Sequence, residues 1–587
     1  MKKIPSFASK FASKLAAFST ITLAISLATL PTTQVYAQNK PQDTNAKNVK
    51  TPTSIANDPI NTNEKYFDIA KNLDIFATLF KEVNTYYVDE ITPSEVMEQG
   101  IYSMLNNLDP YTVYYPEDKI EDYRTLTTGQ YGGIGASVVT RNGKSIVTMP
   151  FEGYAAQKAG LQIGDEIIKI DGIDIQGKSQ AELGQVMKGQ ADTEVSITVK
   201  RFSVAEPITL KMKREKIKID NVTYSGMVTA DIGMIRLTDF TNNASKEVKD
   251  ALVALKEKGA KKIILDLRGN PGGLLSEAIN ISNIFVPKGV EIVSTKGKVK
   301  EWNKKYNALM QATDEQIPMA VLTSSTSASA AEIVSGVIQD YDRGVLVGQN
   351  TYGKGLVQAT RSLSYNAKLK VTVAKYYIPS GRCIQAIDYT HRNSDGSVGK
   401  VADSLRVAFK TKNGRVVYDG GGVKPDIEVS KDRNIPIIAS LDSKGLLFEY
   451  ANEYRTKYKQ LAAPKEFKLT DDEYKDFVKW LDKKDYDYVT KVEKTITELE
   501  KTAKDEKYYE DIKSQIESLK AKLYHNKESD LLKFKTEIKE LLEHDIVAHF
   551  YLEKGRIEAG FDSDADILEA VKVLNDKARF DKLLAGK

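Results

Sequence analysis

The stretch MAVLTSSTSASAAEIVSGVIQDYDRGVLV, residues 319–347, contains the pattern that decides the fold class. It opens with an uninterrupted apolar run, Met319–Leu322, as a strand buried on both faces requires. After Ser329 the large apolar residues recur with helical spacing, at Ile333, Val334, Val337 and Ile338. A second apolar run, Val345–Val347, follows. Strand, helix and strand in this order predict a mixed α/β core.

The alternation of strands and helices continues on both sides of this stretch, between residues 213 and 432. Buried apolar runs predict strands, and amphipathic runs predict helices. We expect strands at 233–237, 262–267 and 369–374, and helices at 245–258 and 274–285. The segment 391–422 is polar and contains glycine, so we expect a loop insertion there.

Three further regions differ in composition from this core. Residues 64–128 show helical spacing of apolar residues, and residues 129–212 switch to short strands and turns with two short helices. Residues 433–587 are dense in lysine and glutamate and carry an apolar helix stripe at Ile512, Ile516, Leu519 and Leu523. This stripe predicts packing within a helical C-terminal domain or homo-oligomerisation through it. The expected fold class is α+β and multidomain.

The first 63 residues are expected to direct export rather than to fold with the core. Lysines at positions 2, 3, 10 and 14 precede an uncharged run, Leu15–Leu30, and Val35-Tyr36-Ala37 matches a small-x-small cleavage site. Residues 1–37 are therefore predicted to be a signal peptide, and residues 38–63 a disordered linker. The expected location is periplasmic or extracellular, of bacterial type, without stable membrane insertion after cleavage. A retained membrane anchor is the alternative.

Composition argues against several classes of partner and chemistry. The 84 Lys and Arg residues nearly balance the 80 Asp and Glu residues, so nothing indicates a nucleic-acid partner. The single cysteine, Cys383, allows no internal disulfide. Of the four histidines, three lie in the helical tail and one in the insertion, so the α/β core has none for a Ser-His-Asp triad. No metal or cofactor motif is present, and neither is expected.

Ser329 stands at the N-terminus of the predicted helix, among small residues that leave its hydroxyl accessible. The amide of Ala330 has no partner within the helix and can donate to a developing oxyanion. The alternative is structural, because Ser329 and Glu332 have the spacing of a capping box. On this segment alone, the cap is the favoured interpretation.

Lys354 favours a catalytic role for Ser329 over a purely capping one. It lies between Gly353 and Gly355, just after a buried strand, where no helix face accounts for a lysine. A neutral lysine can act as general base for a serine. Its pKa must then fall from about 10.4 to about 7, at a cost of roughly 4 kcal/mol that burial can supply. Gln358 can hold the Lys354 amine by a hydrogen bond. The alternative to a catalytic base is that Lys354 is an ordinary surface lysine in a turn.

The same segment also has the spacing of a phosphate-binding loop, Gly348 followed by Gly353-Lys354. Gly355 stands where such a loop has the serine or threonine that binds magnesium, and the next residues alternate like a strand. A nucleotide-binding protein is therefore disfavoured, and predicted export argues against it as well.

A third segment, KKIILDLRGNPGG at 261–273, ends a buried strand in a glycine turn. Glycine lets the backbone approach a ligand closely, so an amide of Gly272 or Gly273 can complete an oxyanion hole. The alternative is an ordinary turn between a strand and a helix.

Together these motifs resemble the C-terminal processing, or tail-specific, peptidase family over residues 64–432. The matching residues are Leu108-Asp109-Pro110-Tyr111-Thr112, Gly132-Gly133-Ile134-Gly135-Ala136, Ala159-Gly160-Leu161, Ile163-Gly164-Asp165, Asp266-Leu267-Arg268, Ser327-Ala328-Ser329, Gly353-Lys354-Gly355 with Gln358, and Val423-Lys424-Pro425-Asp426-Ile427. The resemblance implies a serine protease with Ser329 as nucleophile, Lys354 as base and Gln358 as its orienting partner. It also implies an oxyanion hole made by the Ala330 amide and by Gly272 or Gly273. Thr326 and Ala331 depart from the glycine and serine usual in the family, without touching the nucleophile.

The resemblance further implies a PDZ domain at 129–212 and a protease core at 213–432. The loop of Gly133, Ile134, Gly135 and Ala136 would then receive the terminal carboxylate of a protein or peptide substrate, whose chain adds as a strand. Leu183, Val186 and Met187 are expected to line an apolar pocket beside it. The expected function is an exported serine endopeptidase that recognises substrate C-termini. A catalytically inactive PDZ adaptor or chaperone on a protease-like core is the alternative.

Overall fold

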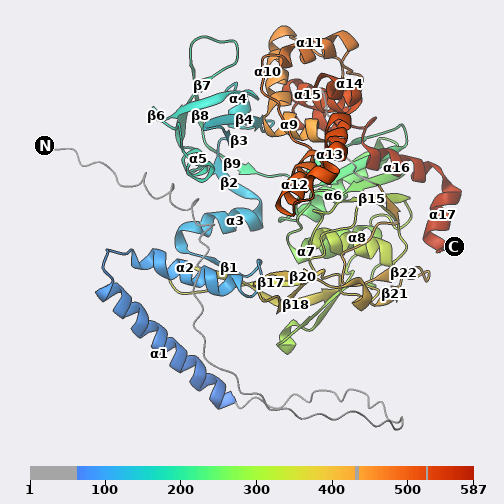
Figure 1. Ribbon diagram of the computed structural model, residues 1–587. Helices are drawn as coiled ribbons and strands as arrows, with labels where there is room; N and C mark the ends of the chain where they lie inside the picture. Colours follow the sequence, from blue (N-terminus) through green and yellow to red (C-terminus); the bar gives the residue numbers. More distant parts are fainter. Residues whose placement is uncertain (1–61, 430–434, 524–526, 587) are drawn as a thin grey trace. The chain divides into compact units, whose positions relative to one another are not determined.

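The computed structural model describes residues 62–429, 435–523 and 527–586. The predicted signal peptide and the predicted linker up to residue 61 lie outside the described residues. The described residues divide into two units, one that ends at residue 91 and one that begins at residue 92. The described part of the first unit is helix α1 (Thr62–Tyr86) and the few residues after it (Figure 1).

The second unit begins with α2 (Pro93–Asn106), β1 (Val113–Tyr115) and α3 (Ile120–Thr128), followed by a small β domain. Its antiparallel sheet has the order β3 (Ala136–Arg141), β4 (Lys144–Pro150), β5 (Glu166–Ile170), β7 (Glu194–Lys200) and β8 (Ile208–Lys213), with β6 (Ile173–Asp174) beside β5. Helices α4 (Ala155–Lys158) and α5 (Gln180–Met187) share its apolar core. Strand β2 (Gln130–Gly133) pairs with β9 (Glu215–Lys218), so the two ends of the domain lie together.

The central sheet of the core has the strand order β10 (Val222–Met227), β11 (Ile232–Leu237), β12 (Lys262–Asp266), β15 (Met319–Thr323), β16 (Val345–Gly348) and β23 (Ile427–Glu428). Neighbouring strands are parallel except for β10 and β11. The apolar sides of α6 (Ala244–Glu257), α7 (Leu275–Phe285) and α8 (Ala330–Asp340) pack on one face of this sheet.

The other face of the central sheet is covered by α16 (Ala565–Asn575), near the C-terminal end of the described chain (Figure 1). Met319 and Val321 belong to the apolar cluster of α6–α8, whereas Ala320 and Leu322 belong to the cluster that contains α16. Because side chains alternate along a strand, burial on both faces requires the uninterrupted apolar run that begins at Met319. No local pattern in the sequence predicts that a helix of the tail covers this sheet.

A second, antiparallel sheet flanks the core in the order β1, β18 (Lys368–Tyr377), β13 (Glu291–Gly297) and β14 (Lys304–Asn307), with β17 (Leu356–Ser362) paired to β18. The strand predicted at 369–374 therefore exists, but it belongs to this sheet and not to the central one. The predicted insertion 391–422 is more ordered than a loop. It contributes to two small ribbons, made by β19 (Ile387–Arg392) with β20 (Val398–Lys400) and by β21 (Ala408–Lys410) with β22 (Val416–Tyr418).

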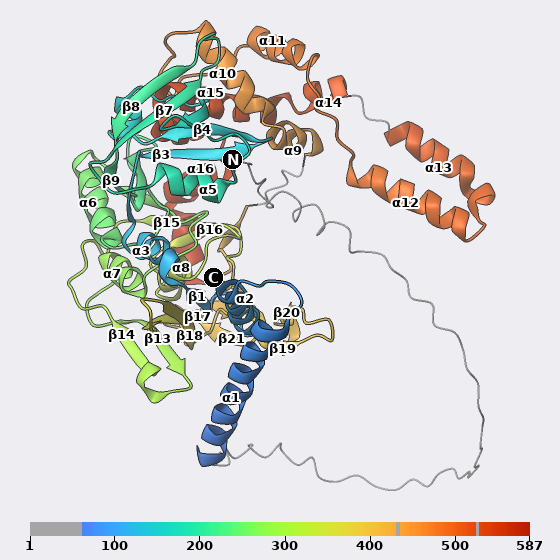
Figure 2. The same cartoon turned by 90° about the vertical axis from the view of Figure 1, so that its left-hand side faces the viewer.

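The C-terminal region is helical, as the sequence predicts. Its helices are α9 (Pro436–Ser443), α10 (Leu446–Lys457), α11 (Asp471–Leu481), α12 (Lys491–Asp505), α13 (Tyr509–Leu523), α14 (Lys527–Lys533), α15 (Lys535–Ala559), α16 and α17 (Lys577–Ala585). Helices α12 and α13 form a hairpin that extends from the rest (Figure 2). Of the predicted apolar stripe, Ile516 is buried and Leu519 is 43% exposed, because α13 packs chiefly against α12. None of the described helices is both long and apolar enough to cross a membrane.

Candidate active site

Ser329 lies between β15 and α8 with backbone angles φ 55° and ψ −113°. A serine with positive φ is strained by roughly 1–3 kcal/mol and persists only where surrounding contacts hold it. Here its amide donates to Glu332 Oε2 at 2.8 Å, and its carbonyl accepts from the Tyr376 hydroxyl at 3.2 Å. Ser329 and Glu332 are arranged as a capping box, the structural alternative raised by the sequence, and the Glu332 amide donates to the Ser329 carbonyl at 2.9 Å. Backbone contacts therefore hold this residue, and its side chain lines the cleft described below.

The glycine turn after β12 packs directly against this serine. A Cβ on Gly272 would lie 2.8 Å from both the Ala330 nitrogen and Ser329 Cβ, so only glycine permits the approach. The Gly272 amide donates to Asn270 Oδ1 at 2.8 Å. The amides of Gly273 and Ala330 donate to no other described residue, so these two are the open donors near the serine.

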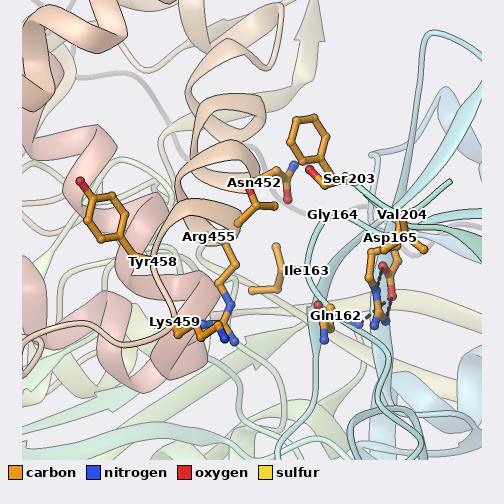
Figure 3. Close-up of a pocket in the computed structure, with 13 residues that line it drawn as sticks. Gln162, Ile163, Gly164, Asp165, Ser203, Val204, Asn452, Arg455, Tyr458 and Lys459 are labelled. Atoms are coloured by element: carbon orange, nitrogen blue, oxygen red, sulfur yellow. Dashed lines mark hydrogen bonds and ion pairs between the residues drawn. The ribbon is translucent and has the colours of Figure 1, made fainter.

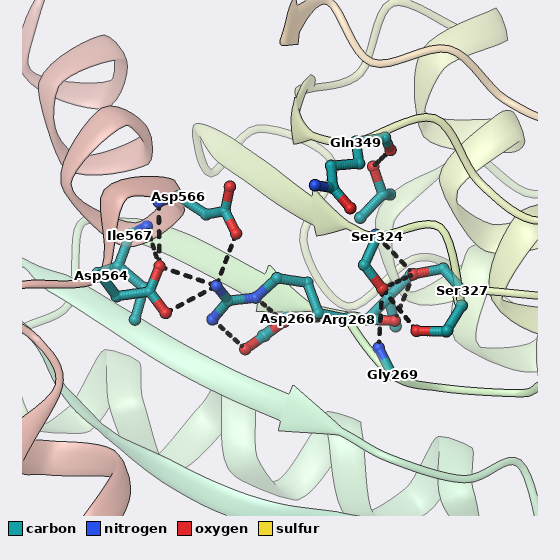
Figure 4. Close-up of polar contacts among 12 residues, drawn as sticks. Asp266, Arg268, Gly269, Ser324, Ser327, Gln349, Asp564, Asp566 and Ile567 are labelled. Carbon is teal, nitrogen blue, oxygen red and sulfur yellow. Dashed lines mark hydrogen bonds and ion pairs between the residues drawn. The ribbon is translucent and has the colours of Figure 1, made fainter. Parts of the chain in front are cut away.

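An ion-pair cluster holds the start of the glycine turn (Figure 4). Arg268 donates through Nε and Nη2 to Asp266 at 2.9 and 2.8 Å, and through Nη1 to Asp564 and Asp566 at 2.7–2.8 Å. Hydrogen bonds join the turn to the segment before Ser329, among them Gly269 N to Ser324 Oγ at 3.1 Å, Ser327 Oγ to the Leu267 carbonyl at 2.8 Å and Ala328 N to the Asn270 carbonyl at 2.9 Å. Sequence reasoning missed both aspartates of α16's N-terminal end, which lie 296 and 298 residues beyond Arg268.

Lys354 is partly buried beside this serine turn, in the loop that leads into β17. Burial, with a smaller contribution from Lys370, lowers the pKa of the Lys354 ammonium to about 8. The carboxylates of Glu332 and Asp109 act in the opposite direction and favour the charged form. The amine is therefore neutral in a substantial fraction of molecules near pH 8.

The segment 109–112, noted above only as a family motif, supplies the surroundings of this lysine. Asp109 Oδ1 accepts from the amides of Tyr111 and Thr112 at 2.8 Å each. The Tyr111 ring centroid lies 4.2 Å from Lys354 Nζ, within range of a cation–π interaction. Gln358 Nε2 donates to the Thr372 hydroxyl at 3.1 Å, and the Thr112 hydroxyl lies 3.4 Å from the same group.

A single cleft of about 460 Å³ collects the predicted catalytic residues. It is lined by Ser329, Ala330, Gly272, Gly273, Lys354 and Gln358, together with apolar side chains of Leu126, Leu274, Leu275, Ile333, Leu356 and Val357. Within the described residues no hydrogen bond joins Ser329 to the amine of Lys354, or Gln358 to that amine. The cleft therefore places these groups together around a space that a peptide can enter, without closing them into a bonded triad.

The predicted carboxylate-binding loop lies between β2 and β3. The Ile134 carbonyl accepts from the Ala156 amide at 2.9 Å, and Gly135 takes φ +76° against the side chain of Tyr154. Gly133 is buried at the end of β2, while Ala136 begins β3. Of the residues expected to line an apolar pocket, Leu183 is fully buried in the domain core, and Val186 and Met187 are partly buried and pack against that core.

Strand β3 is an edge of its sheet, so its outward backbone groups are not used by a neighbouring strand. The side-chain amide of Gln180, the first residue of α5, occupies two of them. Its nitrogen donates to the Val138 carbonyl at 2.7 Å, and its oxygen accepts from the Thr140 amide at 2.8 Å. The amide thus makes the pair of bonds that one residue of an added strand would make.

Another pocket, of about 370 Å³, lies between the β domain and α10 (Figure 3). Its lining includes Asp165 and Arg201, which form an ion pair at 2.7 Å, and Asn452 and Arg455 of α10. None of the predicted site residues lines it, so the cleft at Ser329 is the candidate active site.

Comparison with known proteins finds three matching family models. Peptidase family S41 matches residues 231–391, a PDZ domain matches 146–201, and the C-terminal helical domain of a probable PDZ-protease matches 437–574. A carboxy-terminal-processing protease of Bartonella bacilliformis is 38% identical over 324 residues, which cover 54% of this chain and 74% of the relative. A probable CtpA-like serine protease of Staphylococcus aureus is 37% identical over 316 residues, 53% of this chain and 62% of the relative.

Among solved structures, the photosystem II D1 C-terminal processing protease is 24% identical, with 63% of this chain and 96% of that chain covered and a TM-score of 0.34. The three family models follow one another along the chain in the order of the β domain, the core and the helical region. The chain therefore belongs to peptidase family S41, as a serine-type peptidase of the carboxy-terminal-processing group with a PDZ domain and a C-terminal helical domain.

Proposed function

We propose that the protein is an exported endopeptidase with a Ser329–Lys354 dyad, and that it recognises the C-termini of its protein substrates through the PDZ domain. One observation carries the proposal: a strained, accessible serine and a partly buried lysine with a lowered pKa line the same cleft. The chain belongs to a family of serine peptidases, and no histidine lines this cleft. Both observations favour a lysine as the base.

In the proposed reaction, neutral Lys354 accepts the proton of the Ser329 hydroxyl while Oγ attacks the substrate carbonyl. The amides of Ala330 and Gly273 donate to the oxyanion, and this choice of glycine follows from the bond that occupies the Gly272 amide. Protonated Lys354 then returns the proton to the leaving amine, and water hydrolyses the acyl-enzyme by the same route in reverse. Gln358, whose nitrogen is held by Thr372, has its Oε1 left to accept from the lysine amine.

Substrate capture is proposed to use the loop 133–136 for the terminal carboxylate and the edge of β3 for the chain before it. A carboxylate forms charge-assisted hydrogen bonds that a C-terminal amide cannot match. An amidated peptide should therefore be cleaved more slowly than the same peptide with a free C-terminus, as measured by kcat/KM. Equal values for the two peptides would contradict capture of the C-terminus and leave the dyad untouched.

The dyad is tested by incubating the mature protein with an unfolded protein substrate. Ser329→Ala and Lys354→Ala should each lower proteolysis by at least about a thousandfold while circular dichroism shows the fold intact. Lys354→Arg should fail too, because a guanidinium stays protonated and cannot act as base. Appreciable cleavage by Lys354→Arg would contradict the assignment of the base, and unchanged cleavage by Ser329→Ala would contradict the nucleophile.

A further inference from the structure

Glu332 is a completely buried carboxylate in the first turn of α8. Its Oε2 accepts from the amides of Ser329 and Lys354 at 2.8 and 2.9 Å. Its Oε1 accepts from the Gly353 amide at 2.7 Å and from the Thr351 hydroxyl at 2.5 Å. One side chain thus bonds the backbone of both predicted catalytic residues.

A capping box accounts for only one of these four hydrogen bonds, the one from Ser329. The other three donors come from the lysine loop, 351–354, which follows a different strand of the central sheet. Other hydrogen bonds also join the two segments, such as the Tyr352 amide to the Ser327 carbonyl at 3.0 Å. Glu332 differs from them because it contacts the amides of Ser329 and Lys354 themselves.

Burial raises the pKa of Glu332 above its usual value, because a carboxylate loses its hydration, and the four hydrogen bonds oppose this rise by favouring the charged form. The ionised carboxylate satisfies all four donors at once. A neutral amide of the same shape cannot, because its NH₂ group would face donors on one side. The contacts therefore require an acceptor with two oxygens at this position.

We propose that Glu332 is the positioning residue that sets the separation and orientation of Ser329 and Lys354 by bonding the backbone of both. This inference rests on the proposed dyad and adds to it a residue that touches neither the substrate nor the reacting atoms. The bonds hold Ser329 in its strained conformation and fix the point from which the lysine side chain extends. The negative charge has a second consequence, since it favours the ammonium form of Lys354.

Two substitutions separate position from charge. Glu332→Gln removes the charge and one of the two acceptor oxygens at nearly constant shape. It should lower kcat by about 10–100-fold with little change in KM, because misplacement of about 1 Å costs such factors. Without the carboxylate the Lys354 ammonium is less favoured, so the acidic limb of the pH–kcat/KM profile should move to lower pH. Glu332→Asp keeps the charge but shortens the reach, so kcat should fall while the limb stays in place.

Ser335→Ala is the matched control, because its buried hydroxyl in α8 bonds only the Glu332 carbonyl, at 3.3 Å, and reaches neither loop. It should keep both kcat and the pH profile. A purely structural role for Glu332 predicts a lower melting temperature and fewer active molecules, with kcat per folded molecule unchanged in both variants. That result, or wild-type kcat in Glu332→Gln, overturns the inference. If Glu332→Gln does not fold, an unchanged kcat in folded Glu332→Asp overturns it.

The same series includes wild type and Ser329→Ala. If proteolysis depends on Ser329 but not on Glu332, the result contradicts the positioning role of Glu332 and leaves the proposed dyad in place. If proteolysis persists in Ser329→Ala, the result contradicts both the proposed dyad and the positioning role of Glu332.

Discussion

At the scale of single residues, the environment of Lys354 balances opposing effects. Burial and Lys370 favour the neutral amine, whereas Glu332, Asp109 and the face of the Tyr111 ring favour the ammonium. The resulting pKa of about 8 is higher than the value of about 7 that the sequence argument assumed for a base. Roughly a tenth of the lysine is then neutral at pH 7, which is sufficient for a base that is regenerated in each cycle.

Activity should therefore rise with pH and reach half of its plateau near pH 8, where Lys354 loses its proton. Lys370→Met removes a positive charge from the cleft, which raises the pKa of Lys354 and moves this midpoint to higher pH. At pH 7 the variant should lose about two- to fivefold in kcat/KM. The pH profile of peptide hydrolysis measures the shift. Lys375→Met, an exposed position on the same strand, is the control and should leave the midpoint unchanged. A midpoint that moves to lower pH in Lys370→Met would contradict this electrostatic account.

At the scale of elements, the proposed capture of a substrate C-terminus would take place between the edge strand β3 and helix α5. Gln180 already bonds the Val138 carbonyl and the Thr140 amide, which face away from β4. A substrate strand that adds to this edge must displace the Gln180 amide before it can form the same two bonds. In the proposed capture, Gln180 of α5 would therefore compete with the substrate for the edge of β3.

Gln180→Ala should tighten the binding of a free C-terminal peptide by about three- to tenfold, because each hydrogen bond that need not be broken is worth about 0.5–1.5 kcal/mol. The dissociation constant is measured by fluorescence anisotropy with the Ser329→Ala chain, which cannot cleave the peptide. Gln185→Ala, an exposed position on the same helix, should bind like the parent. Weaker binding by Gln180→Ala would mean that this side chain contacts the ligand rather than excluding it.

At the scale of the second unit, the C-terminal helix α16 completes the core. It covers one face of the central sheet with Ile567, Ala570 and Val573, and its N-terminal end reaches the glycine turn through Arg268. Asp564 also caps the helix by accepting from the amides of Asp566 and Ile567. A segment near the C-terminus thereby supports the turn that faces the predicted nucleophile.

Replacement of both Asp564 and Asp566 by asparagine should lower the melting temperature by about 3–8 °C, since two buried or half-buried partners of Arg268 lose their charge. It should also lower kcat, because the start of the glycine turn is held less firmly. Thermal unfolding and steady-state kinetics on the same preparation measure the two effects. Asp562→Asn, at an exposed carboxylate beside the helix, is the control. A melting temperature equal to that of the parent would show that the cluster does not hold α16 to the core.

Local patterns in the sequence are enough to predict the order of the elements and the positions of Ser329 and Lys354 within them. The apolar run at Met319, the helical spacing after Ser329, and the glycines around Lys354 are local patterns, and local patterns reflect period, turn chemistry and burial directly. They placed the serine at a helix start and the lysine after a buried strand, as the structure has them. The sequence alone leaves open whether the amide of Gly272 or that of Gly273 is free to donate to an oxyanion.

Only the tertiary structure decided what surrounds these residues. It brought the Tyr111 ring to Lys354, Asp564 to Arg268 across 296 residues of chain, and Gln180 to the edge of β3. It also showed that the Gly272 amide is occupied. Such contacts depend on how distant segments pack, and hydrophobic periodicity records which face of an element is buried but not which partner buries it.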